Sequence, residues 1–195
     1  ILSGGIAILY FPTIYIIKQG RKTSHKNTSN LLMKIGLLSD THSVLHPKVF
    51  EHFKNCDEIW HAGDIGTVEV IDQLSAFKPL RAVYGNIDNH KIRAICPKNL
   101  RFECEGVKVW ITHIGGYPYK YTKNIRQELD KNSPDLFICG HSHILKVIYD
   151  KNREILHMNP GAAGNYGIHK VITMLRFDIE KGEIKNLEVI EFNRN

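Results

Sequence analysis

The sequence has few cysteines, and no two of the four form a C-x-x-C pair. Three of them lie within or beside apolar runs, where a thiol acts as a small hydrophobic side chain. This spacing argues against a disulfide framework. We therefore expect free thiols and a reducing compartment, the cytoplasm.

The first 32 residues lack aspartate and glutamate, although they contain four lysines and arginines. They therefore carry four of the six net positive charges of the chain. The remaining 163 residues have too small a positive charge to form the basic surface that a nucleic-acid-binding protein needs. A nucleic-acid partner is therefore not expected.

Residues 1–17 are almost entirely apolar, and a polar, basic stretch follows them. Seventeen residues are at the lower limit for a membrane span, and glycine and proline interrupt this run. A basic start and a cleavage site, as in a secretory signal, are not visible. The first methionine is Met33. We interpret 1–32 as an extension outside the fold, non-native or mis-started, and 33–195 as one domain; membrane association is expected only if 1–17 is a genuine anchor.

From residue 33 onward the sequence has no internal repeat or low-complexity tract. Short β-rich runs alternate with amphipathic stretches, which is typical of an α/β layer architecture. Helices are expected over 47–55, 68–77 and 122–132. Strands are expected over 34–39, 58–63, 79–85, 100–112 (two strands), 135–140, 144–150, 154–159, 170–179 and 183–192. This pattern favours two sheets packed face to face with helices outside.

A side chain able to bind a metal follows each of five predicted strands. These residues are, in chain order, Asp40 and His42, Asp64, Asn86, His113, and His141 and His143. In α/β sheets the functional crevice lies outside the carboxyl ends of the strands, so we expect these side chains to converge there.

The set contains two carboxylates, four imidazoles and one amide. Seven ligands exceed the needs of one tetrahedral ion but suit two ions that share a carboxylate. Without a thiolate, the donors suit borderline divalent metals. We expect two such ions, and the donor set does not choose among manganese, iron, zinc and nickel.

Each motif alone has an ordinary explanation. A lone H-x-H is more often a surface pair or a satisfied buried histidine, and an aspartate after a strand is common in turns. The series is more informative, because all five motifs fall at strand ends in order. A glycine also directly precedes Asp64, Asn86 and His141, which gives the backbone room to bend there.

The series D-x-H, G-D, G-N, T-H and G-H-x-H resembles the calcineurin-like metallophosphoesterase superfamily. The GNID pattern and the short chain are most similar to its compact branch of small microbial phosphodiesterases, which also includes a eukaryotic retromer subunit of the same fold. The resemblance covers residues 33–192. It implies a four-layer α/β/β/α sandwich, made of two facing mixed sheets, with a two-metal site.

The resemblance also implies the role of each ligand. Asp40, His42 and His143 would hold one metal, and Asn86, His113 and His141 the other. Asp64 would bridge both, and a metal-bridging hydroxide would attack phosphorus. Asp64, Asn86 and Asp88 are the expected catalytic residues.

The chain departs from the superfamily at Ile87, where a histidine that protonates the leaving group is usual. Asp88 alone remains from that motif, and the compact branch commonly lacks the histidine. Asp88, His90 or water could supply the proton instead. The site should therefore favour leaving groups that depart without much help.

These observations together predict a two-metal-dependent phosphoesterase, and a phosphodiesterase rather than a monoesterase. The expected partner is a small phosphate ester, and a homo-oligomer is left open. The alternative is a protein-interaction scaffold of the same fold that has lost catalysis. Retention of all seven ligand positions favours the enzyme.

Overall fold

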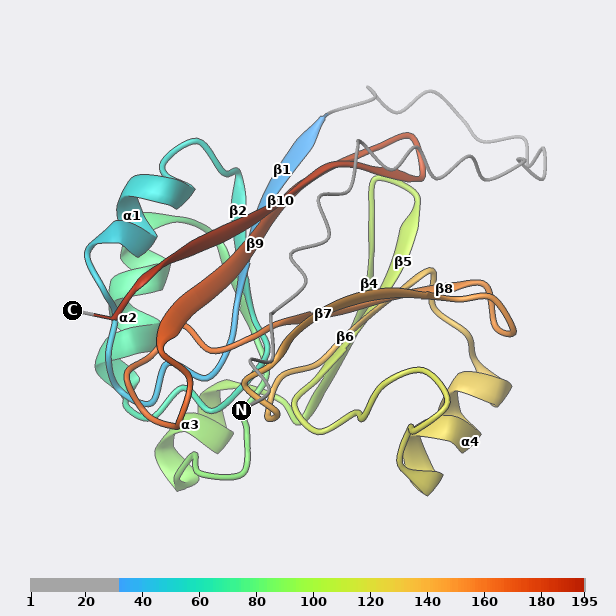
Figure 1. The fold of residues 1–195 in the computed structure, drawn as a ribbon, viewed down its shortest axis with the longest axis horizontal. Helices are drawn as coiled ribbons and strands as arrows, with labels where there is room; N and C mark the ends of the chain where they lie inside the picture. Colours follow the sequence, from blue (N-terminus) through green and yellow to red (C-terminus); the bar gives the residue numbers. More distant parts are fainter. Residues whose placement is uncertain (1–31, 195) are drawn as a thin grey trace, which may run out of the picture.

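The computed structural model of the chain describes residues 32–194, so all but one residue of the proposed extension 1–32 lies outside the described residues. The first of two sheets has the strand order β10-β9-β1-β2-β3 (Figure 1). Strands β1, β2 and β3 are parallel, whereas β9 and β10 run antiparallel to their neighbours. The strands are β1 (Met33–Leu38), β2 (Glu58–His61), β3 (Leu80–Ala82), β9 (Val171–Glu180) and β10 (Glu183–Asn193).

The second sheet has the order β4-β5-β6-β8-β7. Its three inner strands are parallel, and an antiparallel strand lies on each edge. The strands are β4 (Asn99–Cys104), β5 (Val107–Thr112), β6 (Leu136–Ile138), β7 (Leu145–Asp150) and β8 (Ile155–Pro160). Both sheets are therefore mixed, and β1, β2, β3, β5, β6 and β8 end in loops at one shared edge.

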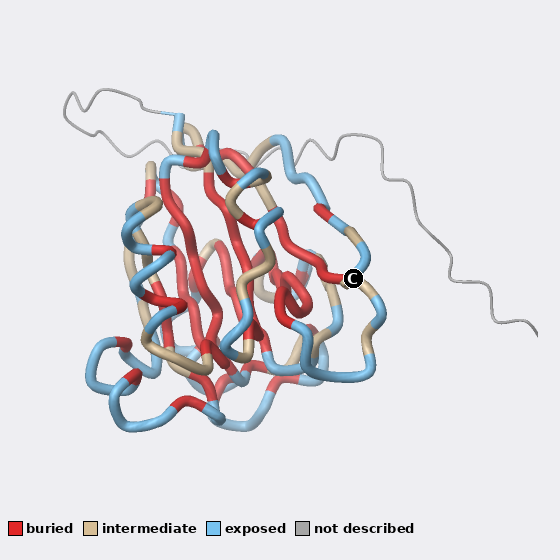
Figure 2. The backbone as a smooth tube through the Cα atoms, turned by 90° about the vertical axis from the view of Figure 1, so that its left-hand side faces the viewer, coloured by how far each residue is buried: buried red, intermediate tan, exposed pale blue. Residues whose placement is uncertain are grey.

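The main core lies between the two sheets. Trp60 of β2 is fully buried there and contacts Phe102 of β4 and Phe177 of β9, with ring centroids 5.1 and 5.7 Å apart. Its indole N–H donates to Glu58 at 3.1 Å, which satisfies the one polar group of this side chain. Figure 2 shows that buried residues run along the strands, while the surrounding loops are largely exposed.

Helices cover the outer face of each sheet. The helices α1 (Lys48–Phe53), α2 (Val68–Phe77) and α3 (His90–Ile95) pack on the first sheet through a second apolar cluster. Helix α4 (Lys123–Lys131) covers the second sheet through Ile125 and Leu129 (Figure 1). The predicted α/β/β/α sandwich of two facing mixed sheets is confirmed.

Helix α3 lies in a region for which only an irregular link is expected from the sequence. The side chain of Asn89 caps it, accepting hydrogen bonds from the backbone N–H groups of Lys91 and Ile92 at 3.0 and 3.3 Å. Of its six residues only Ile92 is buried. A single buried residue leaves no visible helical periodicity, and the cap was the one available signal.

His157 of β8 is buried beneath α4, beside Tyr121 and Phe137. Neither of its ring nitrogens has a hydrogen-bond partner among the described residues. Burial lowers the pKa of His157 to about 4. The unfolded chain, with an ordinary histidine pKa of 6.5, therefore binds a proton before the folded chain does.

His157→Leu should accordingly reduce the loss of stability on acidification. The free energy of unfolding of the native chain falls as pH drops from 6.5 toward 4, and at pH 5 this histidine accounts for about 2 kcal/mol of the fall. Urea unfolding at pH 7.5 and pH 5 measures the difference. His90→Leu, at an exposed position, is the matched control. An equally steep pH dependence in His157→Leu and the native chain would contradict this account.

Candidate metal centre

Loops from both sheets bring the seven predicted ligands together at the shared edge of the sandwich. The first sheet contributes four of them and the second sheet three. Asp40 and His42 follow β1, Asp64 follows β2, Asn86 follows β3, His113 follows β5, and His141 and His143 follow β6. The site therefore lies between the sheets.

The first cluster comprises Asp40, His42 and His143, whose ligand atoms all lie within 4.8 Å of one another. His143 Nε2 is 3.3 Å from Asp40 Oδ1 and 3.2 Å from His42 Nε2. Asp40 is fully buried, while the two histidines are partly exposed. One face of this cluster is thus open to a ligand from solvent.

The second cluster comprises Asp64, His113 and His141, again within 4.8 Å of one another. His113 Nε2 lies 3.1 Å from Asp64 Oδ1 and 3.1 Å from Asn86 Oδ1. The rings of His113 and His141 meet edge to face, with centroids 5.3 Å apart. Asn86 is therefore close enough to join this cluster as a further oxygen donor.

Asp64 connects the two clusters. Its Oδ1 faces His113 at 3.1 Å, and its Oδ2 faces His42 of the first cluster at 3.8 Å. Burial alone would raise the pKa of Asp64, but its hydrogen bond with His113 and the N–H of Ile87 outweigh that effect and lower it. Asp64 is an anion at neutral pH and presents one oxygen to each cluster.

The donor chemistry at His113 fits a cation. Its Nδ1 lies 2.8 Å from the carbonyl oxygen of Ala62, an acceptor, so Nδ1 carries the proton and donates. In the neutral ring Nε2 is then a lone pair aimed at two oxygen acceptors, those of Asp64 and Asn86. Three acceptors at this spacing require a proton or a metal ion between them. Burial opposes a charged ring, but the hydrogen bond to Asp64 and the charge of Asp40 outweigh it and raise the pKa of His113.

Five of the seven ligand positions have left-handed backbone conformation. Their φ angles are 56° at Asp40, 47° at His42, 53° at Asp64, 69° at His141 and 57° at His143. Such φ angles are uncommon outside glycine and cluster at functional sites. They turn the chain sharply at the strand ends, so that consecutive loops hydrogen-bond to each other, as Asp40 N does to Gly63 O at 2.9 Å.

Gly85 allows the loop after β3 to approach the loop after β2. A Cβ atom at this position would overlap the carboxylate and backbone N–H of Asp64. Any other residue would push Asn86 away from Asp64. The glycine before Asn86 thus serves close approach of two ligand loops rather than a special φ angle.

Asp88, expected to take part in catalysis, is buried within the loops. Its Oδ2 accepts from the N–H groups of Ile65 and Gly85 at 3.1 and 2.7 Å, and its Oδ1 accepts from Gly66 N–H at 2.7 Å. The carboxylate therefore ties the Asp64 loop to the Asn86 loop. His90, the other acid considered, is exposed in the first turn of α3.

His61 supports the ligand loops without being a ligand. Its Nδ1 accepts from Gly63 N–H at 3.1 Å, and its Nε2 lies 2.9 Å from the hydroxyl of Thr41. That hydroxyl donates to Ile65 O at 2.9 Å, so it accepts from His61. Burial lowers the pKa of His61 to about 4, which keeps the ring neutral in this role.

Two residues that the sequence did not associate with the site lie against it. The ring of Tyr166 is 4.8 Å from that of His42, and the ring of His169 is 5.3 Å from that of His143. Both belong to the loop between β8 and β9. No local pattern signals them, because the contacts span 26 residues or more along the chain.

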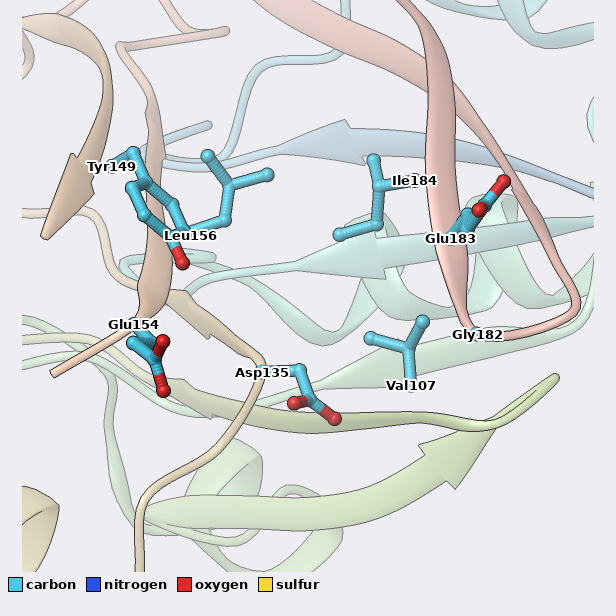
Figure 3. Close-up of a pocket in the computed structure, with 8 residues that line it drawn as sticks. All are labelled: Val107, Asp135, Tyr149, Glu154, Leu156, Gly182, Glu183 and Ile184. Carbon is cyan, nitrogen blue, oxygen red and sulfur yellow. The ribbon is translucent and has the colours of Figure 1, made fainter. Parts of the chain in front are cut away.

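A further pocket lies at the opposite edge of the sandwich (Figure 3). Val107, at the start of β5, and Ile184, near the start of β10, are part of its lining. Both strand ends are remote from the metal-ligand loops. None of the seven candidate ligands lines this pocket.

Within the described residues, no helix is both long and apolar enough to cross a membrane.

Comparison with known proteins is consistent with this geometry. The model of the calcineurin-like phosphoesterase superfamily domain matches residues 33–182. A protein described as a probable metallophosphoesterase from Methanothermobacter thermautotrophicus is 30% identical over 135 residues, which are 67% of this chain and 77% of the relative. A phosphodiesterase from Methanocaldococcus jannaschii is 27% identical over 171 residues, covering 80% of this chain and 98% of the relative.

Solved structures share the fold. The zinc complex of Vps29 from Entamoeba histolytica superimposes with a TM-score of 0.62 at 18% identity, covering 84% of this chain and all of that one. At this identity the similarity concerns the fold alone. The family model, by contrast, spans most of the chain and all seven candidate ligands. The chain therefore belongs to the calcineurin-like phosphoesterase superfamily, whose members use divalent metal ions.

Proposed function

We propose that this chain is a two-metal-dependent phosphodiesterase. The observation that carries the proposal is the position of Asp64, one oxygen of which faces each of two three-residue ligand clusters. Asp64 would contribute to both sites, and paired divalent ions are a common arrangement in metal-dependent phosphoester hydrolysis. When bound, the ions supply positive charge for the phosphate and lower the pKa of water.

The residues of the chain then have separate roles. Asp40, His42 and His143 would hold one ion, Asn86, His113 and His141 would hold the other, and Asp64 would be shared by both. Asn86 would offer the second ion its side-chain amide oxygen, which lies 3.1 Å from His113 Nε2, and its NH₂ group stays free to donate to a phosphate oxygen. Residues 33–195 would form the catalytic domain.

We assign Asp88 a positioning role in this reaction. Both of its oxygens accept hydrogen bonds from backbone N–H groups. Through these bonds it fixes the distance between Asp64 and Asn86. With Asp88 in this role, no side chain from residues 85–88 is available to protonate the leaving group. The substrate should therefore have a leaving group of low pKa, or the leaving group should take its proton from water.

Ile87→His should restore an acid at this point. Ile87 is 46% exposed, and its N–H donates to Asp64 at 3.1 Å, so a histidine there would reach the space beside the second cluster. General acid catalysis contributes about 10²–10⁴-fold. We expect at least about a tenfold gain in kcat on an alkyl phosphodiester and little change on a 4-nitrophenyl ester.

The control for this variant is Ile87→Asn, which is polar but has no acidic proton to give. The measurement is the ratio of kcat on the two esters in each protein. If the ratio in Ile87→His equals that of the native chain, the missing acid is not the reason why the site prefers good leaving groups.

The metal is proposed to be manganese, with nickel, iron or zinc as alternatives. The donors are imidazole nitrogens, carboxylates and an amide oxygen, which suit all four. A hydrolysis panel tests both metal and substrate: each ion is combined with a phosphomonoester, a phosphodiester and a cyclic nucleotide. Hydrolysis of the diester above the monoester supports the proposal, and no hydrolysis with any of the four metals would refute it.

A protein-interaction scaffold is the second candidate. The observation in its favour is the fold similarity to Vps29, a vacuolar sorting protein. A scaffold without catalysis has no need for a complete ligand set, yet all seven candidate ligands lie at one edge of this chain. The same metal panel decides between the two, because a scaffold would be inactive with every ion.

A further inference from the structure

Three exposed isoleucines directly follow candidate metal ligands. Ile87 follows Asn86, Ile114 follows His113, and Ile144 follows His143; their side chains are 46%, 43% and 62% exposed. Successive Cα atoms lie about 3.8 Å apart. The Cα atom of each isoleucine therefore lies about 3.8 Å from the Cα atom of a candidate ligand.

Tyr166 adds a fourth apolar surface from another part of the chain. It is 69% exposed, and its ring lies 4.8 Å from the ring of His42 at an interplanar angle of 35°. We refer to Ile87, Ile114, Ile144 and Tyr166 together as the apolar rim. Its members come from four different loops, which follow β3, β5, β6 and β8.

The four side chains of the apolar rim are not part of the hydrophobic core. Large side chains in the core of this protein have exposures near zero, and the rim residues are at least 43% exposed. Isolated exposed aliphatic residues are common, but a gathering of them around one site marks a binding surface. A phosphate ester held at the clusters would place its ester groups against these side chains.

The charged groups beside the rim favour the same interpretation. Arg93 lies next to Asn86, but its guanidinium donates to the backbone carbonyls of Asp88 and Asn86 at 2.7 and 3.2 Å. Arg194, beside the Tyr166 loop, likewise donates to the carbonyls of Gly167 and His169. Both guanidinium groups are engaged by backbone carbonyl groups. These hydrogen bonds compete with the binding of a second anionic group of a substrate.

We propose that the apolar rim binds a hydrocarbon ester group of the phosphate-ester substrate, and so selects diesters with an apolar alcohol component. The inference rests on the proposed phosphodiesterase function and names its substrate class. Ile114 and Ile144 are specificity-determining residues in this scheme.

Two diesters with the same 4-nitrophenyl leaving group, methyl 4-nitrophenyl phosphate and n-hexyl 4-nitrophenyl phosphate, test the proposal. The alkyl groups differ little in their electronic effect on phosphorus, so the ratio of kcat/KM reports the contact with the chain. For the manganese-loaded protein we expect a preference for the hexyl ester of at least about tenfold, because each buried CH₂ group contributes roughly fourfold.

Ile114→Thr and Ile144→Thr should each reduce this preference for the hexyl ester severalfold. Threonine keeps the β-branch, so the backbone preference of each position is retained. Val189→Thr is the matched control: Val189 is 51% exposed in β10, pairs with Leu175 of β9, and should keep the full preference. Thermal unfolding of each variant checks its fold, and the preference of the native chain decides the question if a variant is unfolded.

Equal kcat/KM on the two diesters would overturn the inference and leave the phosphodiesterase function intact. A preference that survives in both isoleucine variants would also overturn it. Hydrolysis of neither ester would refute the proposed function itself, and the inference with it. A further outcome would be equal rates on the two esters together with co-sedimentation with phosphatidylcholine vesicles that Ile144→Thr abolishes. In that case the ligand of the apolar rim would be a lipid surface and not an ester group of the substrate.

Discussion

Asp64→Ala is expected to abolish metal-dependent hydrolysis of an aryl phosphodiester, with a fall in kcat/KM of at least about a thousandfold. The reason is the position of its carboxylate, with Oδ2 toward His42 and Oδ1 toward His113. Removing it takes one ligand and one negative charge from both clusters at once. Steady-state rates over a range of manganese concentrations measure the effect.

Two further variants separate catalysis from folding. Asp64→Asn keeps the shape of the side chain but not its charge, so it should fold normally and lose most of its activity. Asp72→Ala, at an exposed position on α2, should behave like the native chain. Full activity in a folded Asp64→Ala protein would refute the two-metal proposal.

Metal binding should raise the thermal stability of this protein substantially. The ligands of each proposed ion come from loops of both sheets, so bound ions would connect the two halves of the sandwich across their shared edge. An ion present at 100 times its dissociation constant stabilises the folded state by about 2.7 kcal/mol, and two ions by about twice that amount. For a chain of this size we expect Tm to rise by about 10 °C or more.

Calorimetry in EDTA and in excess manganese measures this shift. Asp40→Ala removes a ligand of the first cluster only, and about half of the shift should remain. Asp72→Ala, remote from the clusters, should show all of it. An identical Tm with chelator and with metal would refute binding at this edge, whatever the activity of the protein.

The main architecture could be predicted from the sequence because strands alternate with helices up to β3, whereas the later elements are almost all strands. Strand β2, three residues before Asp64, is wholly buried, and such runs are recognisable without a structure. Helix α3 was not predicted, since its single buried residue, Ile92, produces no periodic signal. What made it a helix was the Asn89 cap together with packing on the first sheet.

The candidate ligands could be identified because each lies shortly after a strand, and the ends of strands can be predicted from the sequence pattern. The contacts between loops that position these ligands could not be predicted. Asp88 resembles a catalytic acid in sequence, yet its environment consists of three backbone N–H groups contributed by two loops. Tyr166 and His169 reach the clusters only because β8 and β9 lie in different sheets, and the connection between them passes over the site.

The left-handed ligand positions also carry a cost in stability. Asp40, His42, Asp64, His141 and His143 each hold a conformation that costs an ordinary residue about 1 kcal/mol, a sum comparable with the net stability of many domains. Glycine would adopt the same turns without strain. Substituting glycine at one of these five positions should therefore relieve strain in the fold while it removes a candidate ligand. The loops that gather the ligands thus hold stability in reserve for the side chains that a metal would bind.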